Sequence, residues 1–137
     1  MALSTTVRVK AIMSKGMVSL EKGLSIRSAV KTMVHKDVGS VVITAHGKPV
    51  GMVTERDILK SLAFRKVVRP DTPVEAIMSA PLVAVNSNST IGDAAELMAK
   101  NKIRRLLVKE NGRYVGIVTQ RDLQKAMTDT FRSLLLL

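Results

Sequence analysis

The chain has 137 residues, no cysteine and a formal net charge of +11, with 22 basic and 11 acidic side chains. A chain of this length buries about 68–70% of its unfolded surface, which suits one compact body or two small units that share a core. The lack of cysteine excludes disulfides, thiolate chemistry and cysteine-based metal sites. No apolar run approaches the roughly 20 residues of a membrane-spanning helix, and the N-terminus lacks a secretory-signal pattern. We therefore expect a cytoplasmic protein without a membrane span.

The positive charge is spread unevenly along the chain. Residues 1–69 carry 13 basic and 4 acidic side chains, whereas residues 70–137 carry 9 and 7. A basic surface attracts polyanions such as nucleotides, nucleic acid, acidic proteins or anionic lipid. It also serves simply as a solvated surface that keeps a protein soluble, and the composition is compatible with both interpretations.

An internal repeat with a period of 65 residues runs through the chain. Residues 11–60 align with residues 76–125 without a gap and share 16 identities in 50 positions, far above chance. Repeats of this size usually mean that neighbouring units bury a common face. We therefore treat the chain as two copies of one small unit.

Each copy opens with a short predicted helix that ends in the sequence Ala-Ile-Met-Ser. In the second copy we expect Thr72 as the N-cap, Pro73 at the first position and Glu75 in a capping box. A short strand follows at residues 17–20 in the first copy and at residues 82–85 in the second.

An amphipathic helix comes next in both copies. In the first copy its apolar residues recur between Ile26 and Val34 at intervals of three and four, as one face of an α-helix requires. In the second copy the same helix is predicted to start from Thr90 as the N-cap, with Asp93 at the third helical position.

A hairpin and a final helix complete each copy. The first strand of the hairpin is solidly aliphatic, which indicates that both of its faces are covered, and a Gly-containing turn links it to the second strand. The resulting order of strand, helix, strand, strand and helix belongs to the α/β (α+β) class. The predicted strands lie at residues 41–43 and 50–54 and again at 106–108 and 115–119, and the final helices begin near Asp57 and Asp122.

One short pattern, Gly-x-x-Thr-x-x-Asp, occurs in both copies, at residues 51–57 and at residues 116–122. With the helix and hairpin that precede it each time, it resembles the CBS domain, named after cystathionine β-synthase. The resemblance covers nearly the whole chain. It implies two CBS units that pack sheet to sheet with pseudo-twofold symmetry and assemble further into a homodimer, a disk of four CBS units. The implied boundaries are 8–64 and 73–128 for the two domains, 65–72 for the linker and 129–137 for a C-terminal tail.

CBS pairs bind adenosine-containing ligands such as AMP, ADP, ATP, NAD or S-adenosylmethionine in the cleft between the two units. The resemblance therefore implies that Asp57 and Asp122 accept hydrogen bonds from the ribose hydroxyls, since an ionised carboxylate only accepts. Thr54 and Thr119, with the helix starts behind them, would face the phosphate. The alternative is a plain capping box, in which each aspartate only satisfies backbone N–H groups.

Other residues are implied around each aspartate. Arg104 would point toward phosphate. Its counterpart in the first copy is Gly39, so the two sites need not be equivalent. The alternative is that Arg104 and Arg105 form a surface pair. Aromatic residues are scarce, so adenine would lie between aliphatic side chains that could equally be core residues. The implied set is Met13, Val18, Val38 and Ile117 around Asp122, Met78, Val83, Ile103 and Met52 around Asp57, the preceding Arg121 and Arg56, and the backbone of Gly16, Gly39 and Pro81.

The function implied is a regulatory module that senses an adenine nucleotide, needs no cofactor or metal and signals to an unidentified regulated protein. The alternative is a nucleic-acid-binding or basic protein-interaction module. Because the three aromatic residues offer no platform for stacking bases, such binding would depend on phosphate contacts and on salt. The sequence contains neither a Walker loop nor a His-Glu-x-x-His motif, so no such motif indicates an enzyme. The tail at 129–137 could extend the last helix into a dimer interface or be disordered.

Overall fold

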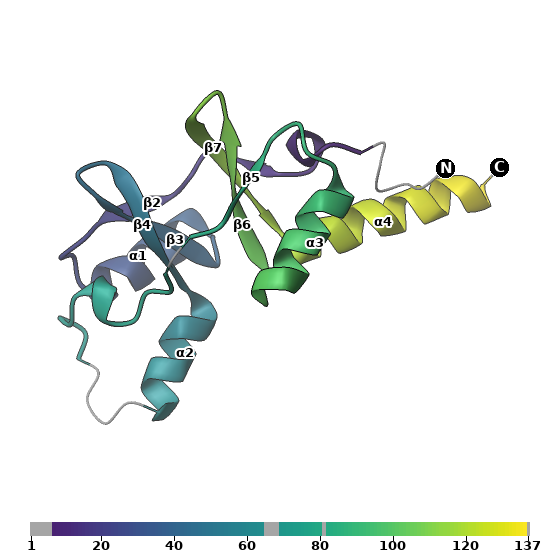
Figure 1. Ribbon diagram of the computed structural model, residues 1–137. Helices are drawn as coiled ribbons and strands as arrows, with labels where there is room; N and C mark the ends of the chain where they lie inside the picture. The colour runs from purple at the N-terminus through teal and green to yellow at the C-terminus, as the bar shows by residue number, and fades with distance from the viewer. Residues whose placement is uncertain (1–6, 65–68, 81, 137) are drawn as a thin grey trace. The chain divides into compact units, whose positions relative to one another are not determined.

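The computed structural model describes residues 7–64, 69–80 and 82–136 of the chain. It is a mixed α/β structure that divides into two compact units. Unit 1 combines Met1–Gly16 with Val83–Leu137, and unit 2 comprises Met17–Leu82. The elements of both units are labelled in Figure 1. The predicted order of strand, helix, strand, strand and helix is confirmed in both copies.

Unit 2 is built on a three-stranded sheet. Strand β3 lies in the middle, parallel to β2 on one side and antiparallel to β4 on the other. The elements are β2 (Ser19–Glu21), α1 (Ile26–Lys36), β3 (Ser40–Ala45), β4 (Lys48–Thr54), α2 (Glu55–Phe64) and the single-turn 3-10 helix η3 (Val74–Ala76).

Unit 1 repeats this arrangement and adds one strand. Its sheet has the order β1-β7-β6-β5, in which the two-residue β1 pairs antiparallel with β7. The elements are the 3-10 helix η2 (Val9–Ala11), β1 (Ser14–Lys15), β5 (Ala84–Asn86), α3 (Ile91–Asn101), β6 (Arg105–Glu110), β7 (Arg113–Thr119) and α4 (Gln120–Leu135). The sequence pattern did not predict β1, because two residues carry no periodicity.

The opening segments of the two sequence copies are exchanged between the units. Val9, from the first copy, is fully buried in the core of unit 1. Val74 and Ile77, from the second copy, are buried in the core of unit 2. Backbone hydrogen bonds hold the exchange in place, such as the 2.8 Å bond from the N–H of Val74 to the carbonyl of Leu24. Each unit therefore combines the opening of one copy with the remainder of the other.

The opening segment of the second copy differs from its prediction. The hydroxyl oxygen of Thr72 accepts a hydrogen bond from the N–H of Arg69 at 3.1 Å, and the carboxylate of Glu75 accepts one from the N–H of Gly23 at 3.0 Å. The capping box predicted for Thr72 and Glu75 is therefore wrong. A single 3-10 turn is too short to need it, and Glu75 instead satisfies a backbone group elsewhere in unit 2.

The capping box predicted at the start of α3 is confirmed. The N–H of Thr90 donates to Asp93 Oδ2 at 3.0 Å, and the N–H of Asp93 donates to Thr90 Oγ1 at 3.1 Å. Helices α1 and α3 both end at a left-handed residue, Asp37 or Lys102, which lie one repeat apart. Both hairpins turn through two residues with positive φ, as a tight two-residue turn requires: His46-Gly47 and Asn111-Gly112.

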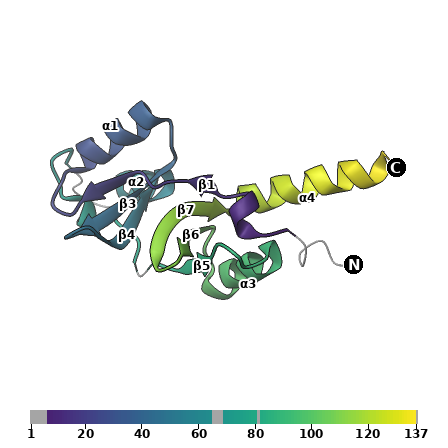
Figure 2. The same ribbon diagram turned by 90° about the horizontal axis from the view of Figure 1, so that it is seen from above.

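The central strands are buried as predicted. Val41, Val42 and Ile43 have no exposed surface, and residues 106–108 are at most 1% exposed. Part of the predicted tail extends the last helix, because α4 runs to Leu135; both views show it extending beyond the sheet of unit 1 (Figures 1 and 2). Over the described residues, no helix combines the length and apolarity that crossing a membrane would take.

Candidate functional site

Each final strand leads into its final helix through one Thr-x-x-Asp step. In unit 1 the N–H of Thr119 donates to Asp122 Oδ2 at 2.8 Å, and the N–H of Asp122 donates to Thr119 Oγ1 at 3.1 Å. Unit 2 has the same pair of bonds between Thr54 and Asp57, at 2.9 and 3.1 Å. Both aspartates therefore cap a helix. Because a carboxylate has about four acceptor positions, capping does not exhaust either of them.

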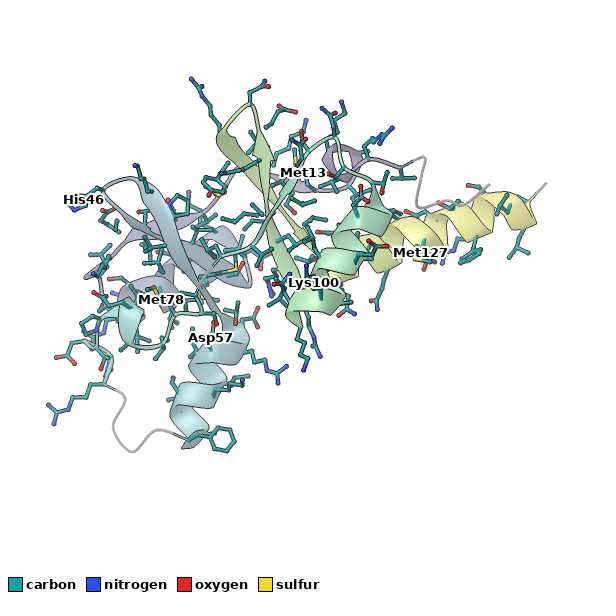
Figure 3. All side chains as sticks on the ribbon, in the orientation of Figure 1. Met13, His46, Asp57, Met78, Lys100 and Met127 are labelled. Atoms are coloured by element: carbon teal, nitrogen blue, oxygen red, sulfur yellow. The ribbon has the colours of Figure 1, made fainter. Side chains whose placement is uncertain are left out.

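The two carboxylates differ in what else they bind. In unit 2 the Thr54 hydroxyl donates to Asp57 Oδ2 at 3.0 Å, and the Ser79 hydroxyl donates to Asp57 Oδ1 at 3.0 Å. Among the hydrogen bonds of the described residues, Asp122 accepts only the one from the N–H of Thr119. Asp122 thus presents Oδ1 to new donors, whereas both oxygens of Asp57 are engaged. Figure 3 labels Asp57 near the start of α2.

The start of each central strand lies beside the first turn of the final helix. In unit 1 the N–H of Gln120 donates to the carbonyl of Arg104 at 2.8 Å, and in unit 2 the N–H of Glu55 donates to the carbonyl of Gly39 at 3.1 Å. Arg105 pairs with Thr119 across β6 and β7. Unit 1 therefore has two arginine residues at this end of the sheet, where unit 2 has Gly39 and Ser40.

The exchanged opening segments lie against the strands that carry the Gly-x-x-Thr-x-x-Asp pattern. A Cβ on Gly116 would overlap the carbonyl oxygen of Ser14 and lie 3.1 Å from the sulfur of Met13. A Cβ on Gly51 would meet the sulfur of Met78. Met13 and Met78 are both labelled in Figure 3. The glycine of the pattern thus lets the opening segment approach closely, and a methionine of that segment lies beside each strand.

The predicted site residues that the structure describes are divided between the two units, and only the apolar side chains among them pack against a core. Arg121 and Arg56 are exposed in the first turns of α4 and α2. The N–H of Gly16 donates to the carbonyl of Val115 at 2.8 Å. Unit 1 holds Met13, Gly16, Val83, Ile103, Arg104, Ile117, Thr119, Arg121 and Asp122; unit 2 holds Val18, Val38, Gly39, Met52, Thr54, Arg56, Asp57 and Met78. Pro81, residues 65–68 of the predicted linker and Leu137 of the tail lie outside the described residues.

The sequence interpretation missed Ser79. Its hydroxyl bonds to Asp57 across 22 positions of the chain, and the repeat gives only a weak signal for this bond. The counterpart residue Ser14 is also a serine but makes no such bond to Asp122 among the described residues.

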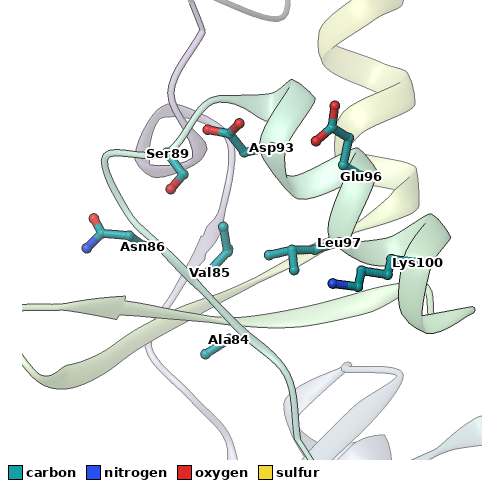
Figure 4. A pocket seen from close by; sticks show the side chains of 8 residues that line it. All are labelled: Ala84, Val85, Asn86, Ser89, Asp93, Glu96, Leu97 and Lys100. Carbon is teal, nitrogen blue, oxygen red and sulfur yellow. The ribbon is translucent and has the colours of Figure 1, made fainter.

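A groove of about 400 Å³ was also not predicted (Figure 4). It lies in unit 1 between β5 and α3, and none of the predicted site residues lines it. Its polar wall comes from Asn86, Asp93, Glu96 and Lys100, all of them exposed. Across residues 7–64, 69–80 and 82–136, no cluster of three or more histidine, aspartate and glutamate side chains could hold a metal ion.

Comparison with known proteins gives a family match over most of the chain. A family model described as the CBS domain matches residues 9–64 and 74–129. A solved CBS domain protein from Pyrobaculum aerophilum, PAE2072, complexed with AMP, is 31% identical with a TM-score of 0.74, over 89% of this chain and 99% of that one.

Two further relatives are similar over most of their length. The solved CBS domain pair of protein MJ0100, in complex with 5-methylthioadenosine and S-adenosyl-L-methionine, is 28% identical with a TM-score of 0.79, over 90% of this chain and 98% of that one. The CBS domain-containing protein YhcV of Bacillus subtilis is 35% identical over 118 residues, which are 84% of this chain and 81% of the relative.

Proposed function

Since the chain belongs to the CBS-domain family, with two family domains along its length, we propose that it is a regulatory module that binds an adenosine-containing ligand. The observation that carries the proposal is the Thr119–Asp122 step, where a capping carboxylate keeps Oδ1 available to a ligand. Two similar proteins, at 31% and 28% identity, were solved with AMP and with 5-methylthioadenosine plus S-adenosyl-L-methionine. These complexes support the ligand class proposed for this chain.

The chemistry of unit 1 suits the ribose and phosphate of such a ligand. Two adjacent ribose hydroxyls donate to the ionised carboxylate of Asp122, and each such charge-assisted bond contributes about 1.5–3 kcal/mol. The guanidinium groups of Arg104 and Arg121 attract the phosphate, with the Thr119 hydroxyl as a further partner. Met13 and Ile117 offer apolar surface for adenine. In unit 2 the corresponding set is Asp57, Thr54, Arg56, Met52 and Met78.

The proposal includes a regulatory rather than a catalytic role. The ligand changes the interaction of the chain with a regulated protein in the cytoplasm, and two copies associate as a homodimer, as the family resemblance implies. Apolar side chains are exposed along the second half of α4, including Phe131 and Leu134, each 52% exposed. This surface suits contact with another protein chain.

The test is ligand-dependent melting of the purified chain with AMP, ATP, NAD and S-adenosylmethionine. A ligand at 100 times its Kd adds about 2.7 kcal/mol to the free energy of unfolding and so raises Tm. Calorimetric titration with the best ligand should then show affinity lowered at least about 10-fold by Asp122→Asn, since a neutral amide loses the charge-assisted bonds but still caps the helix.

The matched control is Asp93→Asn. Asp93 occupies the same position of the same kind of capping box, at the start of α3, but it does not follow β7. This variant should bind like the native chain. Failure of all four ligands to raise Tm would refute the proposal, and equal loss of affinity in the two variants would refute the role of Asp122.

A further inference from the structure

We infer that the hydroxyl of Ser79 competes with the ligand for Asp57, so that the Asp122 step of unit 1 binds the nucleotide more tightly and is filled first. The inference rests on the proposed function and concerns how the two copies differ within it. Ser79 Oγ donates to Asp57 Oδ1 at 3.0 Å, while the N–H and the hydroxyl of Thr54 both donate to Oδ2. A ribose hydroxyl must therefore displace Ser79 or share a carboxylate that already accepts three hydrogen bonds.

Ser79 is held in position by its backbone. Its N–H donates to the carbonyl of Met52 at 2.8 Å, and its carbonyl accepts from the N–H of Met52 at 3.0 Å. Gly51 allows this approach, because a side chain there would run into Met78 and the carbonyl of Ser79. The backbone bonds thus fix the position of Ser79, whose exposed side chain donates its hydroxyl to Asp57.

Unit 1 contains the same serine in a different setting. Ser14, one repeat earlier, lies opposite Ile117, and the pairing continues to Lys15 and Gly116 as strand β1. In unit 2 the corresponding contact is the isolated bridge between Met52 and Ser79. Among the described residues, Ser14 donates no hydrogen bond to Asp122. The two copies therefore present one carboxylate whose Oδ1 accepts a serine hydroxyl and one whose Oδ1 is available.

The charges near the two steps act in the same direction. Lys102, Arg104 and Arg105 precede or open β6 in unit 1, and the residues one repeat earlier are Asp37, Gly39 and Ser40. An anionic ligand gains more attraction at unit 1. Because the bond from Ser79 to the Asp57 carboxylate is exposed to solvent, it contributes only about 0.5–1.5 kcal/mol net, so displacing Ser79 alone should weaken binding at Asp57 by roughly 2- to 10-fold.

The experiment is calorimetric titration of the full chain with AMP, in which Ser79→Ala is compared with the matched variant Ser14→Ala. Each is measured with the other unit disabled: Ser79→Ala together with Asp122→Asn, and Ser14→Ala together with Asp57→Asn. We expect the variant with Ser79→Ala and Asp122→Asn to bind AMP at Asp57 about 2- to 10-fold more tightly than the variant with Asp122→Asn alone. We expect Ser14→Ala to leave the affinity at Asp122 unchanged.

The single variant Ser79→Ala keeps the test decisive if a double variant is not folded, as judged by circular dichroism. In the single variant, the ratio of the AMP affinity at Asp122 to that at Asp57 should be smaller than in the native chain. The inference is overturned if Ser79→Ala leaves the AMP affinity at Asp57 unchanged or weaker, or if Ser14→Ala raises the affinity at Asp122 equally. In either case, binding of AMP by the native chain still supports the proposed function. If neither the native chain nor Ser79→Ala binds AMP, the inference fails, whereas the proposed function fails only if ATP, NAD and S-adenosylmethionine do not bind either.

Discussion

Glu21, the last residue of β2, is an acidic side chain whose hydrogen bonds favour its charged form. Its carboxylate accepts from the Thr44 hydroxyl at 2.6 Å and from the N–H of His46 at 2.7 Å. The bond from Thr44, followed by the one from His46, lowers the pKa of Glu21 below its ordinary value. The charged form therefore stabilises the fold above the ordinary pKa, and this stabilisation is lost as pH falls through the lowered pKa.

From this we predict that Glu21→Gln lowers Tm at neutral pH, because the amide lacks the charge that strengthens both bonds. The deficit should shrink as the pH falls from the ordinary glutamate pKa through the lowered pKa of Glu21, where the native carboxylate becomes neutral as well. Thermal melting of both proteins across the acidic range measures the effect. Glu96→Gln, at an exposed position on α3, is the control and should leave Tm nearly unchanged; a Glu21 deficit that grows on acidification would contradict the prediction.

Individual site residues could be predicted from the sequence where their roles are local. The Thr-x-x-Asp spacing predicts the bonds within Thr54–Asp57 and Thr119–Asp122, because capping depends only on neighbours along the helix. The bond from Ser79 to Asp57 joins an exchanged segment to a helix start, and no local rule predicts it. Ser14, the serine one repeat earlier, makes no corresponding bond to Asp122 among the described residues, so identical residues in the two copies make different contacts.

At the scale of elements, the glycine of the repeated pattern is a packing requirement with a different neighbour in each unit. We predict that Gly116→Ala destabilises the fold by about 1–3 kcal/mol, as overpacking usually does. The added Cβ would overlap the backbone carbonyl of Ser14 within the pairing of β1 and β7, and backbone cannot move aside cheaply. Urea unfolding at equilibrium gives the change in free energy.

Gly51→Ala is the matched comparison and should cost less. Its added Cβ would meet mainly the flexible end of Met78, although the carbonyl of Ser79 lies 3.1 Å away. A larger loss of stability in Gly51→Ala than in Gly116→Ala would show that β1 yields more easily than the Met78 side chain.

The longer helices and strands followed from their sequence patterns, and the short opening helices and strands β2 and β5 were also expected, whereas β1 was not. The apolar spacing between Ile26 and Val34 predicted α1, because a helix buries residues that recur along one face. The aliphatic run at 41–43 predicted β3, because both faces of that strand are covered. The 3-10 turns and β1 are two or three residues long and take their conformation from the sheet they lie on. Each opening segment can pack against the remainder of its own copy or that of the other copy. Because the two copies are similar in sequence, the repeat cannot predict which of these the segment packs against.

At the scale of the whole molecule, that exchange changes the distribution of charge. Along the sequence the basic residues concentrate in residues 1–69. Counted by compact unit, unit 1 has 12 basic and 5 acidic side chains, a net of +7, and unit 2 has 10 and 6, a net of +4. The opening segment carries Arg8, Lys10 and Lys15 to unit 1. The unit with the more available carboxylate is thus also the more basic one.

This excess charge leads to a prediction about nucleic acid. The chain, with a formal net charge of +11, should bind duplex DNA through contacts between its basic side chains and the phosphates. Fluorescence anisotropy with a labelled duplex should show log affinity falling linearly with log salt, with a slope of about −0.9 per phosphate contacted. Asp122→Asn should keep or slightly raise DNA affinity, because it removes a negative charge, while it weakens AMP binding. Salt-insensitive DNA binding would contradict a mechanism based on phosphate contacts. Loss of DNA binding in Asp122→Asn would instead make nucleic acid the ligand of the Thr119–Asp122 step.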